Sequence, residues 1–202
     1  MMTIDFAVMY ATHDAFRRDL RRLSVAAESG RADSPGVEAG WSNFVRQLHV
    51  HHTVEDAALW PQVIAAVSGR PDHLALMAEM EAEHAALDPA LAAVEDALAR
   101  RAADLPERID TLSTILGEHM AHEENSALPL IQEVLTPKDW DTFRSAMARK
   151  QGPSGAAVYI PWVLDDTTPD QRRRFLAAMP GPVAVANQLV LRRRYNSKAL
   201  WR

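Results

Sequence analysis

The sequence predicts an all-α protein, an antiparallel up-down-up-down four-helix bundle followed by a helical C-terminal extension. Three observations support this prediction. Apolar residues recur at intervals of three and four over the first 135 residues. Short turn segments interrupt this pattern, and short turns join antiparallel neighbours. Composition then changes: residues 1–137 carry 10 Lys and Arg against 22 Asp and Glu, and residues 138–202 carry 12 against 5. We therefore expect a bundle at 1–136 and an extension at 137–202.

Four helices are expected in the bundle, at residues 4–28, 37–67, 72–102 and 106–135. Each carries a histidine on its apolar stripe, in chain order His13, His51, His84 and His119. Pro61 and Pro129 fall inside the second and fourth helices, where each removes a backbone hydrogen bond, so we expect bends there. The alternative is that both helices end at these prolines.

The extension is expected to contain further helices. An amphipathic helix at 138–150 is followed by a Gly/Pro turn at 152–155 and an apolar run at 156–164. Helices at 168–179 and 183–199 complete it. No catalytic motif occurs in this part of the chain. We expect it to pack on the bundle or on a partner chain, which would allow a homo-oligomer.

A pattern typical of a metal site occurs twice. The run His51–Asp56 with Pro61 recurs as His119–Glu124 with Pro129, so His, Glu, an acid and Pro repeat at one offset of 68. A His and a Glu four apart lie on one face of a helix, with Cβ atoms roughly 5–6 Å apart. Another histidine precedes each copy. Two helical hairpins would then send six side chains into one core, and this set of ligands suits two metal ions. The six residues are His13, His51, Glu55, His84, His119 and Glu123.

A single histidine on an apolar helix face is more often a hydrogen-bonded core residue than a ligand. The repeat favours the metal site, because buried charged and polar groups cost several kcal/mol unless they are paired or metal-bound. His52 and His122 do not follow the repeat. We consider His52 as an additional ligand and His122 as a residue behind the ligands or on the surface. Asp56 and Glu124 are expected to bind imidazole N–H groups or to be surface charges.

Composition excludes several classes of protein. The chain has no cysteine, which rules out disulfides, zinc–thiolate sites, iron–sulfur clusters and thiol catalysis. Imidazole and carboxylate ligands suit iron or manganese and tolerate zinc. No run approaches the roughly 18 apolar residues of a membrane span, and the first residues lack a signal-peptide pattern. We expect a cytoplasmic protein without a membrane partner. Nucleic acid is not expected either, because the basic C-terminal part lacks aromatic–basic interleaving.

Over residues 1–135 the doubled motif resembles the hemerythrin family, specifically the hemerythrin-like HHE cation-binding proteins of bacteria. The resemblance implies a four-helix bundle with a non-haem di-iron centre. It implies two iron ions bridged by carboxylate, with an oxo bridge as an option, and disfavours manganese and zinc. It gives the role of iron ligand to His13, His51, Glu55, His84, His119 and Glu123.

The chain departs from the oxygen-carrying members of this family at two positions. Met80 stands four residues before His84, where those members have a His-x-x-x-His pair. Glu123 follows His119 by four residues, where they have a His-x-x-x-x-Asp pair. Fewer nitrogen ligands and a more exposed metal should favour reaction over reversible oxygen storage.

We therefore expect a protein that binds or reacts with dioxygen, peroxide or nitric oxide in the context of oxidative stress. Peroxide decomposition is one candidate activity, and sensing is another. The alternatives are a module that sequesters or senses iron or other cations without turnover, and a structural bundle with incidental histidines.

Overall fold

The structure is a computed structural model that describes residues 3–179 and 181–202, with the side chains of 184, 185 and 188 left aside. Among these residues every regular element is a helix and none is a strand, so the predicted all-α class is confirmed. The chain forms two compact units. The first contains Leu48–Lys150 with the residues up to Ile4, and the second contains Asp5–Gln47 and Gln151–Arg202. The predicted boundary after residue 136 divides the chain differently and stays a prediction.

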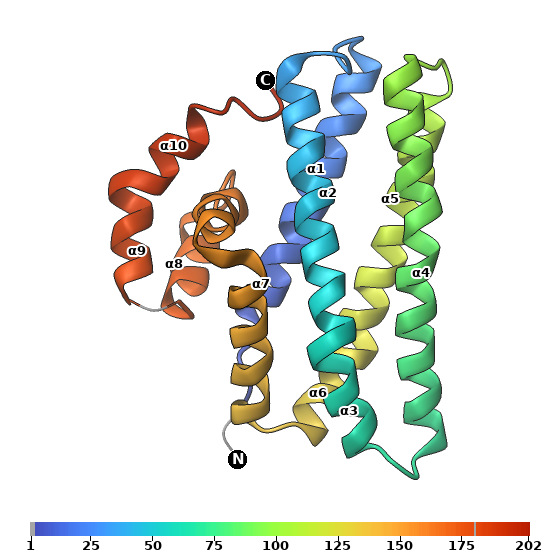
Figure 1. Cartoon of the computed structure of the whole chain (residues 1–202), viewed down its shortest axis with the longest axis vertical. Helices are drawn as coiled ribbons and strands as arrows, with labels where there is room; N and C mark the ends of the chain where they lie inside the picture. Colours follow the sequence, from blue (N-terminus) through green and yellow to red (C-terminus); the bar gives the residue numbers. More distant parts are fainter. Residues whose placement is uncertain (1–2, 180) are drawn as a thin grey trace. The chain divides into compact units, whose positions relative to one another are not determined.

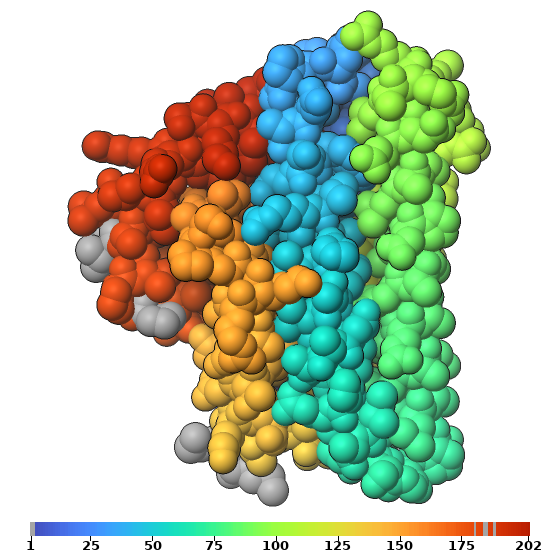
Figure 2. Space-filling view, viewed as in Figure 1, coloured from blue at the N-terminus to red at the C-terminus, as the bar shows by residue number. Residues whose placement is uncertain are grey.

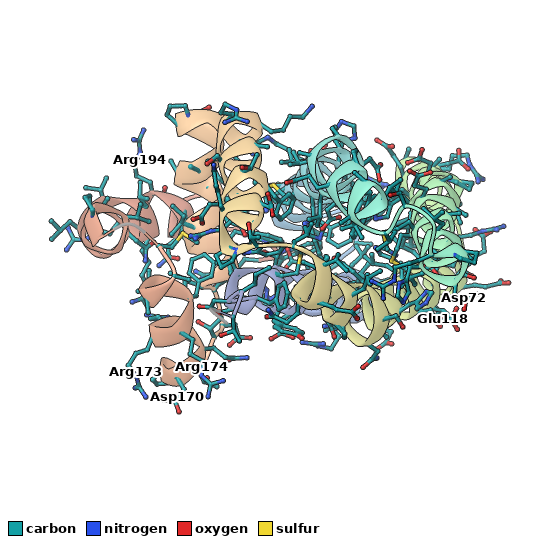
Figure 3. All side chains as sticks on the ribbon, turned by 90° about the horizontal axis from the view of Figure 1, so that it is seen from below. Asp72, Glu118, Asp170, Arg173, Arg174 and Arg194 are labelled. Atoms are coloured by element: carbon teal, nitrogen blue, oxygen red, sulfur yellow. The ribbon has the colours of Figure 1, made fainter. Side chains whose placement is uncertain are left out.

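A long antiparallel hairpin of α4 (Pro71–Arg100) and α5 (Leu105–His122) dominates the first unit (Figure 1). Its buried stripe on α4 has spacings of three and four residues: Met77, Met80, His84, Leu87, Ala90, Val94 and Ala97. Burying a Met, Leu or Val side chain stabilises by about 1.5–3 kcal/mol, so this stripe holds α4 in place. The opposite side of α4 is exposed along its length (Figure 2). Acidic residues such as Asp72 and Glu118 lie on the outside of the hairpin (Figure 3).

The predicted second and fourth helices are present, but each is interrupted by a π-helical turn. The helix α2 (Pro35–Val54) passes into η1 (Glu55–Leu59) and then α3 (Trp60–Ala66). In the same way α5 passes into η2 (Glu123–Ala127) and α6 (Leu128–Val134). The helices α3 and α6 contact each other, and α7 (Pro137–Val163) begins in this unit.

A proline follows the end of each of these two π-helical turns by two residues, and its backbone limits favour the irregularity. Proline has no N–H, and in a regular α-helix its ring would meet the carbonyl of the residue four positions earlier. The residue before each proline instead donates to a carbonyl five positions earlier: Trp60 N–H to Glu55 O, and Leu128 N–H to Glu123 O. The irregularity predicted at the prolines therefore lies in the turn before them. The alternative that the helices end there is wrong, because α3 and α6 continue.

The second unit joins α1 (Ala7–Glu28) and the first part of α2 to the C-terminal elements. The helix α7 is interrupted at Gly152, whose φ of 62° and ψ of 173° lie outside the helical region, as the predicted Gly/Pro turn requires. After the turn, the apolar run is helical. Its Trp162 is fully buried, with its ring centroid 5.3 Å from that of Phe16 on α1. The run therefore packs within its own chain.

The last predicted helices are shorter in the structure. The helix α8 (Pro169–Ala177) begins with a capping box of Thr168 and Gln171. Three short pieces replace the predicted helix 183–199: α9 (Gly181–Ala186), the π-helical η3 (Asn187–Leu191) and α10 (Arg192–Asn196). Arg173, Arg174 and Arg194 project from α8 and α10 into solvent (Figure 3). Of the helices in the described ranges, none is long and apolar enough to cross a membrane.

A buried ionic network ties the C-terminal elements to α1. Asp19 Oδ2 accepts a hydrogen bond from Trp162 Nε1 at 2.7 Å, and Asp19 Oδ1 accepts one from Arg18 Nε at 2.8 Å. Arg18 Nη1 donates to the carbonyl oxygens of Trp162 and Asp165, both at 2.8 Å. Burial raises the pKa of Asp19, and the adjacent Arg18 guanidinium opposes that shift. Removing one partner would leave the other charge buried and unpaired.

Candidate metal centre

The His-x-x-x-Glu motif on α2 forms a contact, as its spacing predicts. His51 lies in the last turn of α2, and Glu55 begins η1 one helical turn later. Their side chains meet with His51 Nε2 3.2 Å from Glu55 Oε1. Glu55 is completely buried and His51 is 4% exposed. Neither oxygen of Glu55 accepts a hydrogen bond from any residue that the structure describes.

The hairpin brings a second imidazole to the same carboxylate and a third imidazole beside it. His84 on α4 places its Nε2 3.7 Å from Glu55 Oε2, and 3.2 Å from Nε2 of His119 on α5. Glu55 therefore directs one oxygen toward His51 and the other toward His84. A carboxylate in this position is suited to bridging two cations.

Carboxylates behind the imidazoles fix their orientation. Asp56 Oδ1 is 2.7 Å from Nδ1 of His84, and Glu83 Oε2 is 2.9 Å from Nδ1 of His119. The other oxygen of Glu83 is 2.7 Å from Nδ1 of His122. A carboxylate accepts, so Nδ1–H donates in each pair and the Nε2 lone pairs of His84 and His119 face each other. Asp56 and His122 thus lie behind the ligand-type residues, as the sequence suggested.

This donor set fits a metal ion. Two unprotonated Nε2 atoms only 3.2 Å apart in a buried site repel each other unless a proton or a cation lies beside them. Glu55 and Glu123 add two fully buried carboxylates in the same unit. Buried carboxylates with few hydrogen-bond donors are costly unless they are protonated or metal-bound. Nitrogen and oxygen donors without thiolate suit iron or manganese.

His52 is part of the cluster, although it does not follow the 68-residue repeat. Its ring is stacked on that of His84, with centroids 4.0 Å apart, and is edge-on to that of His119 at 5.2 Å. One ligand-type nitrogen from each of these three imidazoles lies within 4.8 Å of the others. His52 also forms a second such group with His51 and Glu55. The structure therefore favours the additional-ligand role for His52.

The electrostatics of the cluster agree with a site for a cation. Burial raises the pKa of Glu55 well above its usual value, and the carboxylates of Glu123 and Asp56 raise it further. Burial also lowers the pKa of His119, helped by His84 and opposed by Glu123 and Glu83. A neutral imidazole is the form that binds metal. The raised pKa favours a protonated, neutral Glu55 in metal-free protein, and the lowered pKa favours a neutral His119 that is ready to bind a cation.

Five of the six predicted ligands lie in the first unit: His51, Glu55, His84, His119 and Glu123. His13 is fully buried on α1, in the second unit, and its role as a ligand stays a prediction. Glu83 was not singled out by sequence reasoning. It lies next to His84 but has no counterpart in the repeat, since Ala15 precedes it by 68 residues. Only the distances from its carboxylate to His119 and His122 reveal it.

The comparisons with known proteins agree with this geometry. The family model of the hemerythrin HHE cation-binding domain matches residues 5–131, which is more than half of the chain. The matched range includes all six predicted ligands together with His52, Asp56 and Glu83. No curated protein and no solved structure gives a significant match.

Proposed function

The chain belongs to the hemerythrin HHE cation-binding family, and from this premise we propose that it holds two non-haem iron ions and binds or reacts with a small oxidant. The oxidant class comprises dioxygen, peroxide and nitric oxide. Membership of the family implies a bound cation. The identity and number of the ions, and the oxidant, belong to the proposal.

One observation carries the proposal: the Nε2 atoms of His84 and His119 converge at 3.2 Å, with Glu55 placed between His84 and His51. The four groups come from α2, η1, α4 and α5, so residues far apart in the sequence converge on one place. The two carboxylate oxygens of Glu55, one near His51 and one near His84, would each bind one of two neighbouring ions. Glu123 is the second carboxylate for this role, and His52 and the predicted His13 complete the donor set.

Iron held by these residues would supply a redox centre with positions open to a small ligand. The protein residues prepare that centre. Asp56 and Glu83 hold the Nδ1 protons of His84 and His119, which keeps each Nε2 available. Trp60 is fully buried with its ring centroid 6.2 Å from that of His84, so it keeps water from this side of the cluster.

Met80 distinguishes this chain from an oxygen carrier. It lies one turn before His84 on the buried stripe of α4 and is fully buried. Its thioether is a weaker donor to non-haem iron than an imidazole, because such iron ions prefer nitrogen and oxygen. The site therefore has fewer nitrogen donors from α4 than an oxygen-carrying member. This supports reaction or sensing in preference to oxygen storage.

Iron content and visible absorption test the proposal directly. Protein loaded with ferrous iron under anaerobic conditions should retain about two ions per chain, and its spectrum should change on addition of peroxide or air. The variant His119→Gln should retain less iron. His49→Gln, with an exposed histidine on α2, serves as the matched control and should behave like the wild-type chain. A wild-type protein that retains no iron would refute the proposal.

Consumption of peroxide separates the candidate activities. Iron-dependent loss of peroxide over many turnovers indicates an enzyme. A single spectral change without turnover indicates a sensor. Iron retention with neither response would favour cation sequestration, the alternative that the family match leaves available.

A further inference from the structure

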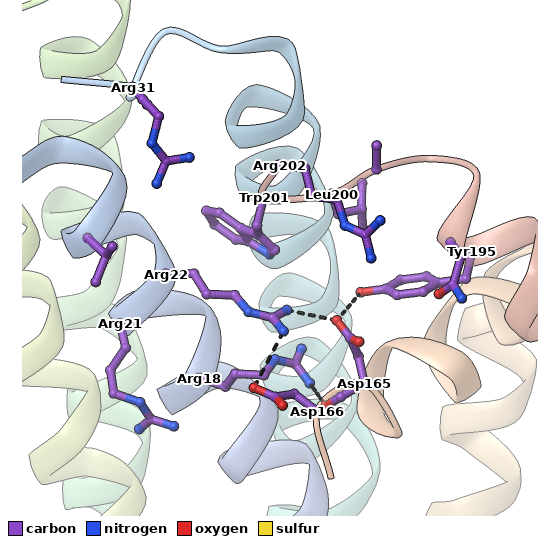
Figure 4. Close-up of a pocket in the computed structure, with 13 residues that line it drawn as sticks. Arg18, Arg21, Arg22, Arg31, Asp165, Asp166, Tyr195, Leu200, Trp201 and Arg202 are labelled. Atoms are coloured by element: carbon purple, nitrogen blue, oxygen red, sulfur yellow. Dashed lines mark hydrogen bonds and ion pairs between the residues drawn. The ribbon is translucent and has the colours of Figure 1, made fainter. Parts of the chain in front are cut away.

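A second candidate site lies in the second unit, within residues that the metal centre does not use. A cavity of about 420 Å³ opens between α1, the loop after α7 and the C-terminal segment (Figure 4). Five arginines line it, together with two aspartates and two aromatic residues. A cavity of this volume is in the range of small-molecule sites.

The arginines of the cavity fall into two groups. Arg18 and Arg22 already have carboxylate partners: Arg18 Nη2 is 2.8 Å from Asp19 Oδ1, and Arg22 Nη1 is 2.8 Å from Asp165 Oδ2. Tyr195 donates to the same Asp165 oxygen at 3.4 Å. Burial and that carboxylate raise the pKa of Tyr195, so its hydroxyl stays a neutral donor. These contacts hold the side chains of Arg18, Arg22 and Tyr195 in place along one side of the cavity.

The second group of arginines has no carboxylate partner among the described residues. Arg31 donates only to the hydroxyl of Ser29, at 3.0 Å. Arg21 and Arg202 have no ion pair with any residue in the described ranges. The lining side chains therefore carry five positive charges against two negative ones. A guanidinium binds phosphate or carboxylate through two parallel hydrogen bonds, so this surplus suits an anion.

Trp201 supplies an independent indication of a ligand. Its side chain is 91% buried, and its indole Nε1–H has no acceptor among the described residues. Buried donors are nearly always satisfied, so one that lines a cavity calls for a partner. Figure 4 shows the Trp201 ring and the guanidinium groups of Arg22 and Arg202 facing the same space.

Close contacts with α2 hold Trp201 in this position. Its backbone N–H donates to the carbonyl of Gly36 at 2.6 Å. Its ring lies only 2.4 Å from the place where a Cβ on Gly40 would stand, so no larger residue fits there. The wall of the cavity is therefore formed before any ligand arrives, which lowers the entropic cost of binding.

We propose that this arginine cavity binds a phosphorylated small molecule that carries two or more negative charges. A phosphate group would lie between Arg22 and Arg202 and accept the Trp201 indole N–H, with Arg31 adding positive charge from the other side of the Trp201 ring (Figure 4). The indole face and the side chains of Val25 and Leu200 would contact the less polar part of the molecule. The metal centre is not needed for this binding.

Adenosine monophosphate is a suitable probe, with inorganic phosphate and adenosine as its separate parts. Calorimetry on the full chain should show binding of the monophosphate, weaker binding of phosphate and none of adenosine. The double variant Arg31→Gln/Arg202→Gln should bind at least tenfold more weakly, because each charged hydrogen bond is worth about a factor of ten or more. Both residues are exposed, so the variant should fold.

The matched control is Arg173→Gln/Arg174→Gln, which removes the same charge from exposed positions of α8 outside the cavity. Its affinity should stay within twofold of the wild type. The variant Glu55→Gln should also bind as the wild type does, which separates this site from the iron centre. No binding at millimolar concentration, or equal binding by the cavity variant and the wild type, would overturn the proposal. Tighter binding of citrate than of the monophosphate would overturn the assignment to phosphate.

Discussion

Replacing Glu55 with Gln tests whether the buried cluster exists for a metal ion. The carboxylate of Glu55 is fully buried and accepts no hydrogen bond from the described residues. It also lies close enough to Glu123 and Asp56 for both to raise its pKa. In metal-free protein this group is a cost to the folded state. In metal-bound protein the same charge is a ligand. Glutamine keeps the shape of the side chain and removes the charge.

The expected effect on metal-free protein follows from that burial. An unsatisfied buried polar group costs about 1–3 kcal/mol, and a charged one costs more. We therefore expect Glu55→Gln to stabilise metal-free protein by roughly 2–3 kcal/mol. For a chain of this length each kcal/mol shifts Tm by about 2–4 °C, so the rise should be about 4–12 °C. Circular dichroism during heating in the presence of a chelator measures it.

In iron-loaded protein this stability advantage of the variant should disappear. A ligand present at a hundred times its Kd stabilises a protein by about 2.7 kcal/mol. The wild-type chain should gain this stabilisation on loading, and Glu55→Gln should lose most of it because glutamine offers iron a neutral and weaker oxygen donor. The control Glu81→Gln changes an exposed glutamate on α4 and should alter stability by less than about 0.5 kcal/mol in either state.

One pattern of results would contradict a role for Glu55 in metal binding. If Glu55→Gln destabilised metal-free protein and iron stabilised variant and wild type equally, Glu55 would be a structural acceptor. The cluster would then be a polar core of incidental histidines, which is the structural hypothesis.

Three further predictions follow from the contacts described above. Asp56→Asn should lower iron affinity about 10–100-fold with unchanged helicity, because it weakens the contact that orients His84. Competition with a coloured chelator measures the affinity, and an unchanged affinity would contradict the prediction. Gly40→Ala should displace the Trp201 indole and shift tryptophan emission to the red. In the control Gly117→Ala the added Cβ meets nothing within 4 Å, so this variant should stabilise α5 by about 0.5–1 kcal/mol. Equal emission spectra of Gly40→Ala and the wild type would contradict the predicted displacement of Trp201. Asp19→Ala should cost about 3–5 kcal/mol in denaturant unfolding by leaving a buried arginine unpaired, and a loss under about 1 kcal/mol would disagree.

Sequence periodicity located the helices well because each has one apolar face. The predicted ranges 72–102 and 106–135 agree within two residues with the outer limits of α4 and of α5 through α6. Prediction was poorer for the last helix, which the structure divides into three short pieces. Among the side chains described there, few apolar ones are buried, so tertiary packing rather than periodicity sets the ends.

The site was predictable from the repeat and from the histidine that each hairpin carries on its apolar stripe, which gives His84. An offset of 68 identifies His51, Glu55, His119 and Glu123. It cannot identify His52, because Met120 occupies the equivalent position, although the His52 ring is stacked on that of His84. These contacts depend on how α2, α4 and α5 face one another across the first unit, which one-dimensional spacing does not contain. Glu83, which lies behind His119, is missed for the same reason, whereas Asp56 follows the repeat and was identified from it.

In the structure, each of the two repeated prolines follows the π-helical turn that begins at a ligand-type glutamate. In both copies the residue before the proline donates to the backbone carbonyl of the ligand-type glutamate, Glu55 or Glu123. The π-helical turn thus begins at the residue whose side chain enters the cluster. Such turns cost energy in a helix and are found mostly at functional sites. Pro61 and Pro129 favour the turn without any metal, although Pro89 lies within α4 without such a turn. The chain itself therefore helps to set the backbone positions of both carboxylates, and the repeat keeps the proline together with the donors.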